Sequence, residues 1–90
     1  MNKIIITIVG KDTVGIVARS CTYLAENNIN VLEITQTILK GFFNMMMIVD
    51  IEKSVKSFED IAKEMEVLGN EIGVTILCQR EEIFTSMHRI

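Results

Sequence analysis

The 90-residue sequence lacks most of the residues that build metal centres, disulfide frameworks and membrane spans. Its single histidine, His88, and its two cysteines, Cys21 and Cys78, form no CxxC or other metal-ligand spacing, so we expect buried thiols and neither a metal nor a cofactor. No apolar run approaches the ~20 residues that cross a bilayer, and residues 1–7 lack the cleavage site of a signal peptide. We therefore expect a cytoplasmic protein that does not enter the membrane.

The charge balance gives no sign of a polyanionic partner. Nine basic and twelve acidic residues give a net charge of -3 without a basic cluster, which argues against nucleic acid and against an anionic membrane surface. Apolar residues make up 49% of the chain, more than a monomer of one small domain needs. Some of this apolar surface is therefore expected to meet a partner.

The periodicity of the apolar residues predicts four strands, two helices and an amphipathic tail. The strand over 31–39 alternates and is expected to be half-buried, with Leu32, Ile34 and Ile38 on its apolar side. Ser57 is expected to cap the second helix, and Gly73 to end it. The expected strands are 3–9, 31–39, 42–51 and 74–79, the expected helices are 14–28 and 58–72, and the tail from Arg80 to Ile90 forms a further short helix.

This order, βαββαβ, predicts an α+β fold, the ferredoxin-like sandwich of four antiparallel strands with both helices on one face, over residues 1–79. The strand over 42–51 is apolar on both sides, with Met45 and Met47 on one and Phe42 and Met46 on the other. Because two helices cover only one face, we expect the second face to lie under the tail helix (80–90), a partner subunit, or both. A homodimer is the expected assembly.

The turn after the first strand, Gly10-Lys11-Asp12-Thr13-Val14-Gly15, has the glycine spacing of a phosphate loop. Ile16 and Val17 follow it where such a loop needs lysine and serine or threonine, which excludes nucleotide hydrolysis. What remains is a strand-to-helix turn whose first helical N–H groups favour a carboxylate or phosphate. Asp12 or Thr13 could equally cap the helix, and the two interpretations are compatible.

The sequence contains no constellation of catalytic residues. The one histidine lies at the end of the chain, away from any diagnostic serine or cysteine, so we do not expect an enzyme. An acylphosphatase would need an arginine in the anion-binding loop, and Arg19 lies on the predicted helix instead. Consecutive methionines at 45–47 point to alternate faces and suit core packing better than a metal. Asn30 opens the second strand with an amide that can both donate and accept hydrogen bonds.

The segments V-G-K-D-T-V-G-I-V-A-R-S (9–20) and L-A-E-N-N-I-N-V-L-E-I (24–34) resemble an ACT domain, and the resemblance covers Lys3 to Gln79 in element order. The tail is similar to that of small stand-alone bacterial ACT proteins. The resemblance implies a regulatory module that binds an amino acid or another small metabolite, often at a dimer interface, between the loop after the first strand and the start of the second. Many members have proline where Val14 stands. The resemblance implies two groups of ligand-binding residues. The backbone at the helix start would meet the ligand's carboxylate, and the residues of this turn are Gly10, Lys11, Asp12, Thr13, Val14 and Gly15. Asn30 and Val31 would come from the facing segment, in the same chain or in a second subunit.

We expect no attached catalytic or DNA-binding domain, so the ligand would be reported by contact with an unidentified protein partner or by a change in assembly. The alternative function is a protein–protein interaction or dimerisation module that has no ligand of its own and binds through its apolar sheet face and tail.

Overall fold

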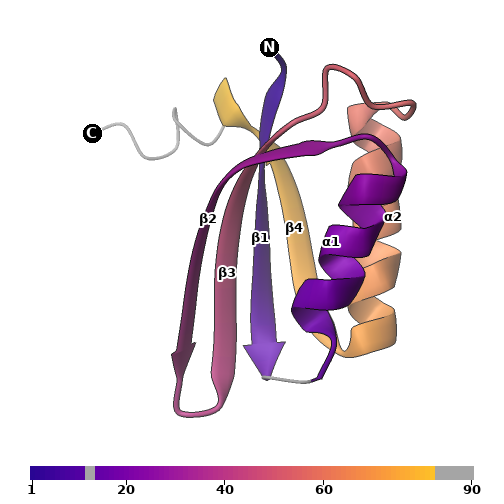
Figure 1. The fold of residues 1–90 in the computed structure, drawn as a ribbon. Helices are drawn as coiled ribbons and strands as arrows, with labels where there is room; N and C mark the ends of the chain where they lie inside the picture. Colours follow the sequence, from indigo (N-terminus) through magenta and orange to yellow (C-terminus); the bar gives the residue numbers. More distant parts are fainter. Residues whose placement is uncertain (12–13, 83–90) are drawn as a thin grey trace.

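The computed structural model describes residues 1–11 and 14–82 (Figure 1). Along the chain the elements are β1 (Lys3–Lys11), α1 (Ile16–Glu26), β2 (Asn30–Leu39), β3 (Phe42–Asp50), α2 (Phe58–Ile72) and β4 (Val74–Arg80). The predicted order βαββαβ is therefore confirmed. The tail helix predicted from Arg80 onward falls mostly on residues 83–90, which lie outside the described residues.

The four strands form one sheet in the order β2-β3-β1-β4, and every neighbouring pair is antiparallel. Both helices lie on the same face of this sheet (Figure 1), which confirms the ferredoxin-like sandwich. Because β1 and β2 both run antiparallel to β3, they run in the same direction, and each begins at the same end of the sheet. This shared direction determines which segments can meet at each end.

The core lies between the sheet and the two helices. Alternate residues of β1, namely Ile4, Ile6 and Ile8, are completely buried on the helix-covered face, as a strand with one packed face requires. Met45 and Met47 of β3 are equally buried, which confirms core packing for these two methionines, whereas Met46 between them is 36% exposed on the other face.

Strand β2 contradicts the prediction of a half-buried strand. Ile34 and Ile38 face the same side as their buried neighbours Met47 and Phe43 on β3, yet they are 47% and 51% exposed. The helices do not cover this edge of the sheet (Figure 1), and the pairing of β2 with β3 shifts register between Val31 and Glu33. The described residues therefore leave the apolar side of β2 open.

The second face of the sheet is partly exposed as well. Val9, Met46 and Leu77 lie on this face and remain accessible, whereas Ile5 is buried there. The described residues thus leave apolar surface in two places, on this second face and along β2.

Polar contacts hold the two helices together. The Tyr23 hydroxyl donates to Glu64 Oε1 at 2.6 Å, and Lys56 Nζ donates to the same oxygen at 2.6 Å. Near the start of α1, Arg19 Nη2 lies 2.8 Å from Glu71 Oε1 on α2. This ion pair turns Arg19 toward α2, so it is not an arginine of the preceding turn.

Candidate functional site

The predicted turn begins later than the sequence suggests, because Gly10 lies within β1. It pairs with Phe43 on β3 and with Val74 on β4, and the strand continues to Lys11. A side chain at Gly10 would place a Cβ 2.9 Å from Val74 Cγ1 and 3.1 Å from its Cα. Gly10 is thus explained by the close approach of β4, and the expectation that it turns the chain is wrong.

Gly15 is the residue of this segment that needs a left-handed backbone. Its φ is +92°, a conformation that glycine adopts without steric cost, and it is the N-cap of α1. Val14 immediately before it is fully exposed, and Ile16 after it is buried in the core. The end of the turn is therefore anchored at Ile16, whereas the Val14 side chain faces solvent. Asp12 and Thr13 lie outside the described residues.

The two helices differ at their first turns. In α2, Ser57 Oγ accepts a hydrogen bond from the N–H of Asp60 at 3.2 Å, and acidic residues stand in the first turn. In α1, the described residues provide no side-chain cap and the first turn has no acidic residue. None of the described side chains therefore compensates the positive end of the helix dipole at the start of α1. Free N–H groups and a positive dipole end suit an anion.

Asn30 and Val31 lie at the other end of the sheet. Asn30 opens β2 in the same row as Asp50 and Lys3, whereas Gly10 lies in the row of Phe43 and Ile38. At roughly 3.3 Å per residue the seven steps from Lys3 to Gly10 span about 23 Å. The structure does not bring the turn and Asn30 together within one chain.

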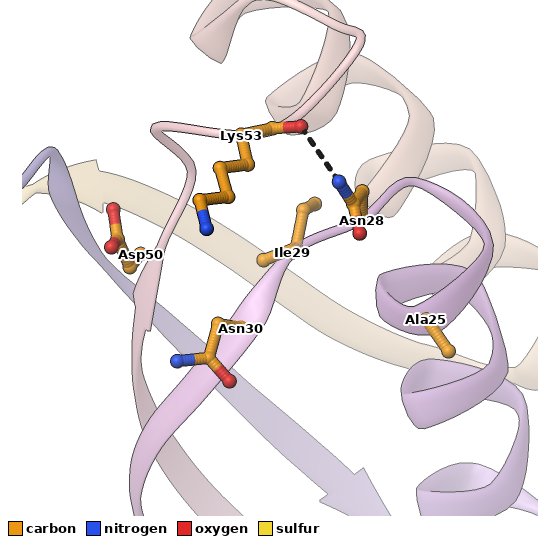
Figure 2. A pocket seen from close by; sticks show the side chains of 6 residues that line it. All are labelled: Ala25, Asn28, Ile29, Asn30, Asp50 and Lys53. Atoms are coloured by element: carbon orange, nitrogen blue, oxygen red, sulfur yellow. Dashed lines mark hydrogen bonds between the residues drawn. The ribbon is translucent and has the colours of Figure 1, made fainter.

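Asn30 instead contributes to a polar pocket of about 300 Å³ (Figure 2). The side chain of Lys53 extends toward Asp50 and Asn30 in this pocket. Asn28, which has a left-handed φ of 61°, donates from Nδ2 to the Lys53 carbonyl oxygen at 3.1 Å and ties the α1–β2 and β3–α2 connections together. The lining residues are Ala25, Asn28, Ile29, Asn30, Asp50 and Lys53.

Opposite charges meet in this pocket. Asp50 Oδ1 accepts from the backbone N–H of Glu52 at 3.0 Å and of Asn2 at 3.1 Å, and these hydrogen bonds hold the pKa of Asp50 below its usual 3.8. The nearby Lys53 ammonium acts in the same direction on that pKa. Within residues 1–11 and 14–82, Lys53 forms no ion pair and the Asn30 side chain forms no hydrogen bond.

Sequence reasoning identified Asn30 but missed Asp50 and Lys53. Counting residues outward from the turn between β2 and β3 would place Asn30 opposite Ile51. The register shift between Val31 and Glu33 brings it opposite Asp50 instead, and the sequence does not reveal this shift. The position of Lys53 depends on the irregular connection between β3 and α2, so it could not be predicted either.

Other kinds of site are not found in the described part of the chain. No group of three His, Cys, Asp or Glu side chains there could hold a metal ion. None of the helices there has the length and apolar character needed to cross a membrane.

Comparison with known proteins identifies the family. A family model described as the ACT domain matches residues 2–79, which include the turn, Asn30 and the polar pocket. The chain belongs to the ACT-domain family. UPF0237 proteins are similar to this ACT domain over the full length of both chains, with 63% identity in Bifidobacterium longum and 44% in Methanocaldococcus jannaschii.

Solved structures agree with this ACT assignment. An ACT domain protein from Streptococcus pneumoniae superposes with a TM-score of 0.81 at 38% identity, covering 92% of this chain and 93% of that one. A formyltetrahydrofolate deformylase from Pseudomonas syringae also reaches 0.81, at 20% identity, over 88% of this chain and 27% of the deformylase. A putative glycine cleavage system transcriptional repressor gives 0.75 at 17% identity, over 88% of this chain and 45% of the repressor.

The last two likenesses establish the ACT fold alone. ACT domains are generally regulatory, ligand-binding modules, and the relatives of this one occur in both bacteria and archaea.

Proposed function

We propose that this ACT domain is a non-catalytic sensor that binds an amino acid between two copies of the chain. The observation that carries the proposal is the start of α1, where the left-handed Gly15 precedes a helix that the described residues leave without a side-chain cap. Its N–H groups suit the carboxylate common to all amino acids. The two thiols, Cys21 and Cys78, are free, which fits our proposal of a reducing cytoplasm.

The proposed site combines the turn of one chain with the start of β2 in another. The backbone of the turn holds the carboxylate, and the Asn30 amide of the second chain accepts from the ammonium group. Two chains are required because the two segments lie about 23 Å apart along one sheet. The proposed turn residues are Asp12, Thr13, Val14 and Gly15, which follow Gly10 and Lys11 at the end of β1, and Val31 supports Asn30.

The exposed edge of β2 is the surface through which we propose that two chains pair. This strand is ten residues long, pairs with β3 alone among the described strands, and contains a single charged residue, Glu33, and no proline. In an antiparallel two-fold pairing centred on Gln36, Ile34 would face the partner's Ile38 and no like charges would meet. The partner's Asn30 would then lie at the end of the sheet where the turn is.

Calorimetry with the twenty amino acids tests the proposal. We expect binding to at least one amino acid, and Asn30→Ala to weaken it about tenfold through the lost hydrogen bonds to a charged group. Asp12→Ala probes the turn in the same titration. Asn70→Ala, an exposed asparagine on α2, is the matched control and should leave the affinity unchanged. Absence of heat with all twenty amino acids would reject the proposed ligand.

A second candidate function is a protein-interaction module with no ligand. The exposed apolar residues Val9, Met46 and Leu77 on the second sheet face favour it. Removing residues 83–90 leaves β4 complete, so a truncated chain that keeps its circular dichroism but no longer captures a partner would support this second function for the tail.

A further inference from the structure

We infer that the ligand is an acidic amino acid, because the pocket beside Asn30 adds one anionic and one cationic side chain to the proposed site. The inference rests on the proposed function, which assigns the ligand's α-carboxylate to the start of α1. Asp50 and Lys53 supply what remains, a partner for the α-ammonium group and a partner for a second carboxylate.

Asp50 is prepared to receive an ammonium group. Backbone N–H groups of Glu52 and Asn2 fix its Oδ1 atom at 3.0 and 3.1 Å, which orients the carboxylate without neutralising its charge. Its Oδ2 atom makes no hydrogen bond to the described residues. Asn30 lines the same pocket and its amide oxygen is a further acceptor, which half a turn of the amide would bring to the Asp50 side, where Figure 2 shows the amide nitrogen.

Lys53 is prepared to receive an anion. Its ammonium group extends into the space between Asp50 and Asn30, and no described carboxylate lies within ion-pair distance. The hydrogen bond of 3.1 Å from Asn28 to the Lys53 carbonyl holds the backbone that carries this side chain. A volume of about 300 Å³ leaves room for a side chain of two or three carbons ending in a carboxylate.

The sum of these charges gives the ligand class. A neutral amino acid would leave Lys53 without a partner, and a basic one would bring a second cation beside it, so the site discriminates by charge as well as by shape. An isosteric pair of ligands, glutamate and glutamine, isolates this effect because the two differ by one charged oxygen.

The test compares these two ligands by calorimetry at low ionic strength, where charge interactions are least screened. We expect glutamate to bind about tenfold more tightly than glutamine, because one charge-assisted hydrogen bond changes the dissociation constant by about this factor. In Lys53→Gln the ratio should fall to about one, mainly through weaker glutamate binding. In Asp50→Asn, whose side-chain oxygen can still accept the two backbone N–H groups, both ligands should weaken by a similar factor.

Lys63→Gln removes the same charge from the exposed side of α2 and is the matched control, which should keep the wild-type ratio. A ratio that survives Lys53→Gln, or glutamine binding as tightly as glutamate, overturns the assignment of the acidic class. Neutral amino acids that bind through Asn30 without any acidic preference would leave the proposed function intact and refute this inference alone. Absence of binding by every amino acid would refute both.

Discussion

Replacing Ile34 with threonine should weaken a dimer assembled through β2 by about thirtyfold. Full burial of an isoleucine side chain stabilises by roughly 1.5–3 kcal/mol, and Ile34 is still 47% exposed in the single chain. Pairing would therefore gain about 1 kcal/mol from this side chain. Two-fold symmetry counts the loss twice, so the dimer should lose about 2 kcal/mol, which corresponds to about thirtyfold in the dissociation constant.

Sedimentation equilibrium over a range of chain concentrations measures this change directly. Threonine keeps the β-branched shape that strands favour, so the folded chain should retain its circular dichroism and its unfolding midpoint. Val67→Thr is the matched control, because Val67 is 51% exposed but lies on α2, away from β2. It should leave the association unchanged.

The same experiment can refute the role of β2. A wild-type chain that sediments near its monomer mass of 10.2 kDa at micromolar concentration would exclude the dimer. Weakening by Leu77→Thr but not by Ile34→Thr would move the interface to the second face of the sheet, where Leu77 is exposed.

Three further outcomes follow from the packing and charges already described. Gly10→Ala should lower the free energy of unfolding by about 1–3 kcal/mol, because its Cβ would lie 2.9 Å from Val74 Cγ1; a urea midpoint equal to that of the wild type would contradict the explanation of Gly10. Burial raises the pKa of the Cys78 thiol to about 12, so at pH 8 this thiol should label with iodoacetamide far more slowly in the folded chain than in denaturant, and equal rates would show that it is accessible. The pKa of Asp50 lies below its usual 3.8, mainly because a backbone N–H donates to it; its contribution to stability is therefore present above about pH 3.8 and is lost as the pH falls through the lower folded value. Asp50→Asn should reduce the acid sensitivity of unfolding in that range, followed by circular dichroism, and unchanged acid unfolding would argue against the role of that hydrogen bond.

The fold could be predicted because each helix and strand is indicated by the spacing of apolar residues and by capping or turn residues close in sequence. The alternation of β1 and the stripe of α2 each indicate one buried face, and Ser57 caps α2 as expected. The hairpin turn at Lys40-Gly41 fixes which strands are neighbours, since both residues have the positive φ of a tight turn.

The burial of β2 could not be predicted in the same way. Alternation shows which residues share a side of a strand, but it does not show whether a helix lies above that side. Ile34 and Ile38 share the side of the core and remain half-exposed because the helices lie elsewhere on the sheet.

The residues of the candidate site and their positions could be predicted only in part. The sequence pointed to Asn30 and to the start of α1, but the distance between them follows from strand direction, which becomes definite once both β1 and β2 are known to run antiparallel to β3. Lys53 belongs to an irregular connection, where no periodicity relates a residue to its neighbours in space.

In the proposed dimer, the placement of the turn and Asn30 at opposite ends of one sheet would have a thermodynamic consequence. In a pair joined along β2, the two-fold axis generates two equivalent ligand positions, each made of one half from either chain. Ligand and partner would then strengthen each other's binding, so the apparent affinity for the amino acid would rise with the abundance of the protein. At chain concentrations below the dissociation constant of the dimer, the protein would bind its ligand weakly, and at higher chain concentrations it would bind more tightly. The amount of bound ligand would therefore depend on the concentration of the amino acid and on that of the protein.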